Sequence, residues 1–241
     1  MLRVLFVVLV VFNPIQKAYT QEAISIQFGL SSFKPYSTQD PETGTCTGLA
    51  VDATKYLLES AQVTVNTSCV APARLFRSIS SGIIDLSINV KSTKSLENKV
   101  TFTKKPFDAL VLNFYSNEER GNLENKVAAI RGYDYNGYRA KLVAQGYEFI
   151  EVPNGVDAIR LFTNRRTQHL LSYGGPFADY LEDKEAKRGT LEPIKITSEL
   201  LASIPTHYAI SKASRHHDAL VEMFDKIDSE SDSEYHLNHR N

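Results

Sequence analysis

The chain has 241 residues, of which 42% are hydrophobic and 23% charged, a composition that excludes collagen-like, low-complexity and wholly disordered proteins. Lys and Arg number 27 against 28 Asp and Glu, so the formal net charge of −1 gives no general electrostatic attraction to nucleic acid or to an anionic membrane. The length is sufficient for one or two domains with hydrophobic cores.

Residues 1–20 have the pattern of a signal peptide. Arg3 precedes an unbroken apolar run over 4–12, which is too short to remain in a bilayer, because a spanning helix needs about 20 apolar residues. Small residues at Ala18 and Thr20 suit cleavage after position 20. We therefore expect an exported, soluble, periplasmic mature protein; the alternative for this segment is a buried N-terminal strand.

The first half of the mature chain alternates between strand and helix patterns. Period-two apolar residues predict strands over 23–28, 63–65 and 83–90, and apolar residues at helical spacing predict helices over 52–60 and 74–81. Strands separated by helices of this length are typical of β-α-β units, so we expect an α/β fold with a mostly parallel sheet.

Cys46 and Cys69 are the two cysteines of the chain, and both fall in this first half. In an oxidising compartment they could form one disulfide that closes a loop of about two dozen residues and contributes about 3 kcal/mol of stability. Two free, buried thiols are the alternative.

A similar passage recurs later, with a strand over 127–130, a Tyr- and Gly-rich turn over 132–137, a helix over 156–164 and a strand over 169–173. The repetition predicts a second α/β lobe of related layout.

Two apolar segments, 110–115 and 206–210, are candidates for strands that cross between the lobes and form a hinge. This organisation divides the mature chain into a discontinuous lobe 1, residues 21–111 and 196–241, and a lobe 2, residues 112–195. The last amphipathic helix has Leu220 and Phe224 on its apolar face, and a solvated tail is expected from Asp228 onward.

Short motifs in a fixed order connect this chain to a known family. They are Phe33-Lys34-Pro35-Tyr36, residues 40–44 and 48–52, Gly82 with Asp85, Thr93, Phe102 with Pro106-Phe107, residues 132–135, Pro176-Phe177-Ala178 and residues 208–212. In these motifs the chain resembles bacterial solute-binding proteins of family 3, which serve polar amino acid transporters. The resemblance covers nearly all of the mature chain.

The resemblance implies a type II periplasmic-binding-protein-like fold, in which two lobes close on one small ligand by hinge motion. Carried over by position, the ligand-binding residues are Phe33, Asn89, Lys91, Thr93, Tyr133 and Asp134. Phe33 would stack on the ligand, the polar groups would face the cleft from lobe 1, and the 133–134 loop would offer free backbone N–H groups to an anionic oxygen. For Phe33 the alternative is a core position, and for the others a solvated loop.

The chain departs from the family at both halves of its amino acid clamp. Leu96 stands where family members have the Arg that grips the ligand carboxylate. Tyr173 and Gly174 stand where the carboxylate that pairs with the ligand ammonium is expected. An ordinary α-amino acid is therefore not the expected ligand.

Other residues could compensate for these losses. Lys91 or Arg74 could replace the cation, and Asp134 the anion, although Lys lacks the planar fork of Arg. Aromatic residues that include Tyr133 and Tyr173 could wall the cleft for a ring or a cationic ligand, with core packing as the alternative role for part of them.

No nucleotide-binding, hydrolase or metal-binding motif occurs, so we expect no cofactor, no metal and no catalytic residue. The expected function is capture of a small polar or aromatic ligand, as a monomer, for an ABC transporter. Two alternatives stay open, a sensor that presents its bound state to a membrane partner and a dehydratase-like enzyme that uses Asp134 as general acid or base.

Overall fold

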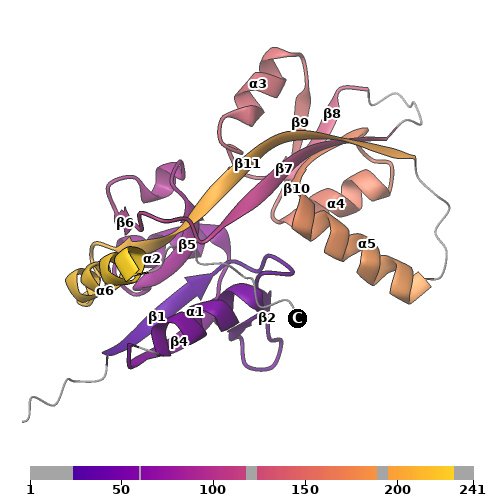
Figure 1. Cartoon of the computed structure of the whole chain (residues 1–241). Helices are drawn as coiled ribbons and strands as arrows, with labels where there is room; N and C mark the ends of the chain where they lie inside the picture. The colour runs from indigo at the N-terminus through magenta and orange to yellow at the C-terminus, as the bar shows by residue number, and fades with distance from the viewer. Residues whose placement is uncertain (1–23, 60, 118–123, 189–194, 231–241) are drawn as a thin grey trace, which may run out of the picture.

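The computed structural model describes residues 24–59, 61–117, 124–188 and 195–230, which form an α/β fold (Figure 1). The helices are α1 (Leu49–Glu59), α2 (Pro72–Ser80), α3 (Tyr138–Ala144), α4 (Gly155–Thr163), α5 (Gly174–Arg188) and α6 (His217–Glu230), with a 3₁₀ turn η1 (Lys94–Leu96). The strands are β1 (Ile24–Leu30), β2 (Thr38–Gln39), β3 (Cys46–Thr47), β4 (Val63–Cys69), β5 (Leu86–Val90), β6 (Val100–Phe102), β7 (Asp108–Asn117), β8 (Lys126–Ile130), β9 (Glu148–Val152), β10 (His169–Tyr173) and β11 (Ile196–Ser211).

One sheet runs through the molecule in the order β4-β1-β5-β11-β7-β10-β8-β9, with β6 also paired to β11. Its two outer parts are parallel, since β1 pairs in parallel with β4 and β5, and β8 pairs in parallel with β9 and β10. Antiparallel pairings of β11 with β5 and β7, and of β7 with β10, join these parts. The predicted β-α-β units therefore form the two ends of the sheet, and the two crossing segments form its centre.

Two separate groups of buried residues lie along this sheet. The first core includes Ile26, Phe28, Leu58, Tyr208 and Phe224, and a satellite cluster beneath α2 extends it. The second core is built on β7, β8 and β10, and another satellite cluster packs beneath α4 and α5. Figure 1 shows the elements of the two cores as two groups, with β7 and β11 running between them.

β11 contributes to both cores. Residues 196–206 pair with β7, and residues 206–210 pair with β5. Ile204 is buried in the second core, whereas Tyr208 and Ile210 are buried in the first. The register of the β7–β11 pair shifts between Leu200 and Ala202, which is the kind of irregularity that bends a strand pair locally.

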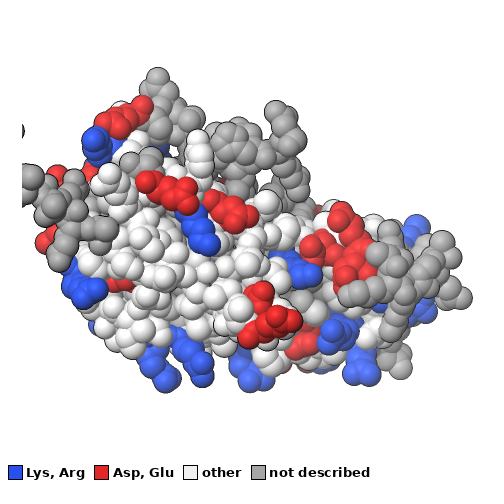
Figure 2. Space-filling model, turned by 90° about the horizontal axis from the view of Figure 1, so that it is seen from below, with Lys and Arg blue, Asp and Glu red and all other residues white. Residues whose placement is uncertain are grey.

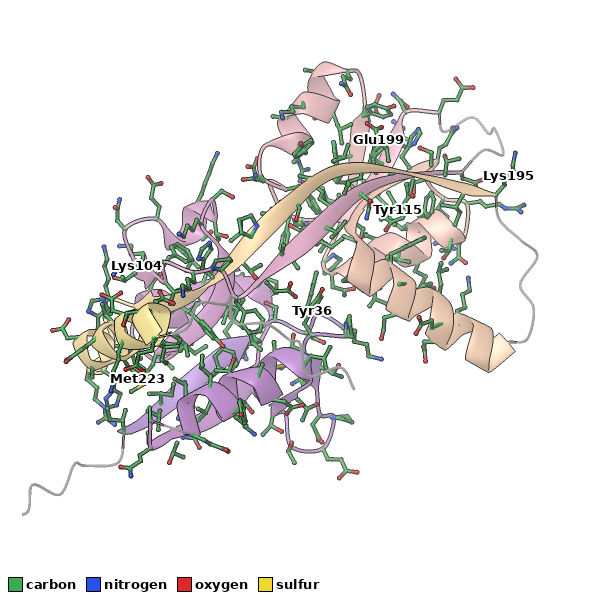
Figure 3. All side chains as sticks on the ribbon, viewed as in Figure 1. Tyr36, Lys104, Tyr115, Lys195, Glu199 and Met223 are labelled. Atoms are coloured by element: carbon green, nitrogen blue, oxygen red, sulfur yellow. A yellow bond between two sulfur atoms is a disulfide. The ribbon has the colours of Figure 1, made fainter. Side chains whose placement is uncertain are left out.

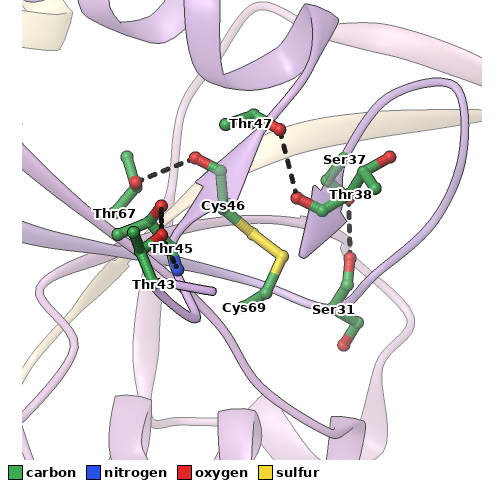
Figure 4. Close-up of a disulfide and its surroundings, with 9 residues drawn as sticks. All are labelled: Ser31, Ser37, Thr38, Thr43, Thr45, Cys46, Thr47, Thr67 and Cys69. Carbon is green, nitrogen blue, oxygen red and sulfur yellow. Dashed lines mark hydrogen bonds between the residues drawn. A yellow bond between two sulfur atoms is a disulfide. The ribbon is translucent and has the colours of Figure 1, made fainter. Parts of the chain in front are cut away.

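A disulfide between Cys46 and Cys69 connects β3 to the end of β4, with a Cα–Cα distance of 4.8 Å (Figure 4). The Thr67 hydroxyl donates to the carbonyl of Cys46 at 2.9 Å, and the Thr47 hydroxyl donates to the carbonyl of Thr38 on β2. The predicted disulfide is therefore present, and it fastens the small β2–β3 hairpin to the main sheet.

Several boundaries differ from those predicted. The third strand begins at Leu86 instead of residue 83, because the backbone bends at 83–84 and Asp85 accepts hydrogen bonds from the Gln27 amide and the Ser214 hydroxyl. The tail expected from Asp228 is helical as far as Glu230, because Asp228 is buried and accepts from the amides of Lys104 and Lys105.

Three elements of the second half are additional to the prediction: α3, β9 and α5. The predicted signal peptide lies outside the described residues. Among the described helices, none combines the length and apolar character that crossing a bilayer requires.

Candidate ligand-binding cavity

A cavity of about 230 Å³ lies between the two cores. Its wall on the first-core side includes Tyr36, Asn89 and Thr93, and its wall on the second-core side includes Tyr133, Asp134, Tyr135 and Tyr173. Phe33 also lines the cavity and packs against the second core. Asp108 and Leu110 of β7 and Ile204 and Thr206 of β11 also line it, so the strands between the cores form part of the wall. A ligand in this space would contact both cores at once.

The loop 33–37 positions the first aromatic residues of the cavity. The Phe33 amide donates a hydrogen bond to the Ser37 carbonyl at 2.8 Å, and the Ser37 amide donates one to the Phe33 carbonyl at 3.0 Å. The Ser37 hydroxyl donates to the Ser31 carbonyl at 2.6 Å. The Tyr36 carbonyl accepts the Ala50 amide of α1 at 2.9 Å. Gly48 is needed beside it, because its φ is 120° and a Cβ there would lie 2.8 Å from the Tyr36 carbonyl oxygen.

This loop also reaches the second half of the molecule. Tyr36 lies between the two groups of elements (Figure 3), and the Phe33 ring meets the Tyr173 ring edge-on at 5.6 Å between centroids. Lys34 lies 4.0 Å from Asp179 of α5, a long and partly exposed ion pair. A Cβ on Gly175, at the start of α5, would lie 3.2 Å from the Tyr36 ring. The loop is thus the direct contact between the first-core side and α5.

Three tyrosines form the opposite wall. The ring centroids of Tyr133 and Tyr135 are 5.7 Å apart, and those of Tyr135 and Tyr173 are 5.8 Å apart. The Tyr135 hydroxyl accepts the Ile130 amide at 2.8 Å, which fixes the 131–137 turn to the end of β8. Burial raises the pKa of all three phenols, so each stays a neutral hydrogen-bond donor at physiological pH.

The cavity carries three charged side chains among the described lining residues: Lys94, Asp108 and Asp134. Asp108 is half-buried, and its Oδ1 accepts the Ala109 amide at 2.7 Å. Asp134 is exposed at the rim, and its Oδ2 accepts the Gly137 amide at 2.9 Å. Uncharged polar groups are contributed by residues such as Asn89, whose amide donates to the Ser87 hydroxyl at 3.0 Å.

The structure brings together six of the eight residues predicted to bind ligand. Phe33, Asn89, Thr93, Tyr133, Asp134 and Tyr173 all line the cavity. Arg74 and Lys91 are not among its lining residues. Arg74 is exposed on α2, where Leu75 and Phe76 face the cavity instead. Lys91 is exposed and directly follows β5. The pKa of the His207 ring is lowered mainly by burial and next by the positive charge of Lys91.

The two departures from the amino acid clamp have structural consequences. Leu96 is 1% exposed and belongs to the apolar cluster beneath α2, so its position is closed to a charged group. Gly174 begins α5, and a Cβ there would lie 3.2 Å from the Asn113 side-chain nitrogen. Neither position offers a charged partner to a ligand.

Sequence reasoning missed several lining residues, notably Tyr36, Lys94 and Asp108. Tyr36 packs against the first core and lines the cavity as well. Asp108 directly follows the Pro106-Phe107 motif at the start of an apolar strand. Its place at the first residue of a strand predicted to cross between the lobes is the sequence feature that could have indicated a cavity-lining carboxylate.

Comparison with known proteins gives matches in structure alone. No protein-family model matches the sequence. No curated protein sequence matches it either. A histidine kinase sensor domain with similarity to periplasmic binding proteins has a TM-score of 0.66 at 19% identity, over 85% of this chain and 88% of that one.

Two further structures are similar. An ancestral arginine-binding protein bound to arginine has a TM-score of 0.66 at 18% identity, over 84% of this chain and 89% of that one. The substrate-binding protein of an amino acid ABC transporter has a TM-score of 0.64 at 14% identity, over 85% and 93% of the two chains. These similarities confirm the predicted periplasmic-binding-protein-like α/β fold.

Proposed function

We propose that this chain is an exported solute-binding protein related to family 3, which captures a small polar or aromatic ligand for an ABC transporter. Residues 21–111 with 196–241 would act as one lobe and residues 112–195 as the other. The strands β7 and β11 would act as the hinge, because they run between the two groups of elements (Figure 1) and line the cavity that lies there. The solute-binding role of two structural relatives supports this assignment.

The observation that carries the proposal is the cavity between the cores, whose wall is drawn from both of them. A ligand that contacts both lobes is bound best when the lobes are closed, so binding shifts the population toward the closed form by that difference in affinity. The overall charge agrees with a small-molecule partner, because 27 Lys and Arg against 28 Asp and Glu give no general attraction to a polyanion. Figure 2 shows both signs on the face seen from below, with basic side chains mainly along its lower edge.

We propose capture without conversion. The two carboxylates of the cavity, Asp108 and Asp134, already accept backbone amides, and the structure gives neither a histidine nor a cysteine among the described lining residues. Incubation with a bound ligand, followed by recovery and mass analysis, is expected to return the compound unchanged. Loss of the compound would favour the dehydratase-like alternative.

A sensor role is the second candidate, because one structural relative is a sensor domain of a histidine kinase. The same closure would then report ligand to a membrane partner instead of delivering it. A transporter partner should be stimulated to hydrolyse ATP by the liganded protein, whereas a sensor partner should change its kinase or phosphatase activity.

Ligand-dependent thermal stabilisation and small-angle scattering test the proposal directly. A ligand found in a screen of amines, aromatic acids, amino acids and small peptides should raise the melting temperature and reduce the radius of gyration, because closure compacts the molecule. Phe33→Ala and Tyr133→Ala, one from each proposed lobe, should each remove most of the shift. Tyr56→Ala, an exposed ring on α1, is the control and should leave the shift unchanged. Ligand binding without compaction would contradict closure.

A further inference from the structure

We infer that the ligand is an organic cation with an apolar or aromatic body and no carboxylate. This inference rests on the proposed solute-binding function and deepens it. The charge of the cavity, its aromatic wall and the absence of a carboxylate grip each argue for it separately.

The charge of the cavity is negative. Asp108 and Asp134 each use one carboxylate oxygen for a backbone amide, at 2.7 and 2.9 Å. Neither has an ion pair with another residue in the described part of the chain, so one oxygen of each remains available. Lys94 is the single cation among the described lining residues, and it is exposed on η1. The cavity therefore has one carboxylate more than it has cations, which favours a positively charged guest.

The rings around the cavity suit the same guest. Phe33, Tyr133 and Tyr173 come from three separate elements, and the Phe33 and Tyr173 rings meet at 5.6 Å. The electron-rich faces of such rings attract ammonium groups, and the attraction increases when the site is shielded from water. Because burial raises the pKa of Tyr133 and Tyr173, the rings stay neutral and add no charge of their own.

Among the described lining residues, a ligand carboxylate would find only Lys94 as a cation, and that side chain is exposed to water. No arginine lines the cavity among the described residues, and the position expected for one is filled by the buried Leu96. Desolvating a carboxylate without a paired cation is strongly unfavourable.

The size of the cavity suits a small molecule. A cavity of about 230 Å³ is of the order expected for one small organic ligand. A small ring amine belongs to this class and carries the positive charge that the lining favours.

The test compares four probes that share one benzene ring: 2-phenylethylamine, 2-phenylethanol, 3-phenylpropionate and phenylalanine. Calorimetric titration and thermal stabilisation are measured for each with the mature chain. The amine is expected to bind at least tenfold more tightly than the neutral alcohol, and the carboxylate should not bind detectably. Phenylalanine should bind more weakly than the amine.

Charge-removing variants then assign the effect to the two carboxylates. Asp108→Asn and Asp134→Asn keep the acceptor for the backbone amide, so the local fold is preserved, and each should weaken amine binding about tenfold. Binding of the neutral alcohol should not change. Glu222→Gln, an exposed acidic residue on α6, removes the same charge away from the cavity and should leave amine affinity unaltered.

The outcomes separate this inference from the proposed function. Tighter binding of phenylpropionate or phenylalanine than of the amine would overturn the cationic ligand but support solute binding in the cavity. Equal affinity for amine and alcohol, or equal loss in the Glu222→Gln control, would also overturn it. If none of the four probes binds and the broader ligand screen also fails, both the cationic ligand and the solute-binding function are contradicted.

Discussion

His169 and His207 are buried imidazoles whose proton positions are set by their neighbours. Nε2 of His169 lies 2.8 Å from the Glu124 carbonyl, which can only accept, so this nitrogen carries the proton and Nδ1 accepts from the Ser116 hydroxyl at 2.8 Å. In His207, Nδ1 donates between the carbonyls of Thr103 and Lys105. Both rings therefore form their hydrogen bonds in the neutral state.

Stability is expected to fall in mild acid because of these residues. Burial lowers the pKa of both histidines below the ordinary value of 6.5. Between the lowered folded value and 6.5, the unfolded chain binds more protons than the folded one, so stability is full above 6.5 and is lost as the pH falls below it. Urea unfolding at about pH 7.5 and about pH 5.5 should show a lower free energy of unfolding at the acidic pH.

The variant His169→Gln tests how much of the loss of stability in mild acid comes from His169. Glutamine can both donate and accept, so it offers a donor and an acceptor for the two hydrogen bonds without a titrating group. The fall in free energy between the two pH values should become smaller but not vanish, because His207 still titrates. An undiminished fall in the variant would show that His169 does not contribute.

At the scale of single residues, the sequence predicts aromatic lining better than charged lining. Phe33, Tyr133 and Tyr173 stand next to recognisable turns and strand ends, and the structure places all three in the cavity. Lys91 was predicted both from its family position and as a substitute for the missing cation, and Arg74 only as such a substitute. The direction of the Arg74 side chain depends on the rotation of helix α2 about its axis, and that of Lys91 depends on the path of the chain after β5. Neighbouring residues in the sequence do not determine either. Which of these residues contact a ligand stays a prediction.

The start of α5 is a sensitive contact between the two halves. A Cβ at Gly175 would lie 3.2 Å from the Tyr36 ring and 3.5 Å from Pro35, close enough to require movement. Gly175→Ala and the larger Gly175→Val should therefore oppose close approach of the 33–37 loop to α5. An overpacked contact costs about 1–3 kcal/mol, so the Val variant should weaken ligand affinity about tenfold or more.

Titration calorimetry and thermal melting of the unliganded variants check this prediction. The melting temperature without ligand should change little if the open form relieves the contact. Gly155→Ala is the control, because a Cβ there would meet a single Ile130 methyl group at an ordinary 3.6 Å. Unchanged affinity in both Gly175 variants would show that closure does not press this loop against α5.

The disulfide is expected to stabilise the element that supports the cavity loop. It closes a loop with a sequence separation of 23, for which chain entropy predicts about 3 kcal/mol. Changing both Cys46 and Cys69 to Ala should lower the free energy of unfolding by about that amount, measured in urea. Reduction of the unaltered protein should have the same effect, and a loss well under 1 kcal/mol in both experiments would contradict it.

At the scale of elements, the strands with clear alternation and the amphipathic helices could be predicted, as β1, α1, α4 and α6 show. The helix α5 could not, because it opens with Gly174-Gly175-Pro176, a run that is more typical of a turn, and its apolar residues follow no single stripe. The edge strand β9 and the short helix α3 lie in a passage rich in charged residues, where tertiary pairing with β8 decides the structure.

For the whole molecule, the order of motifs and the two β-α-β passages were sufficient to predict the fold class, which the structural comparisons confirm. The exact pairing was not predictable, because β11 joins β5 and β7 across a long sequence separation. Local patterns identify such a strand but not its neighbours.

The central place of β11 has a consequence for biosynthesis. It is the last strand in the described part of the chain, yet it separates β5 from β7 in the sheet. Until residues 196–211 emerge, those two earlier strands have open edges, and open edges invite pairing with other chains. A nascent chain of this protein therefore stays vulnerable to aggregation until residues 196–211 have been synthesised, and would benefit from a chaperone that shields it until then.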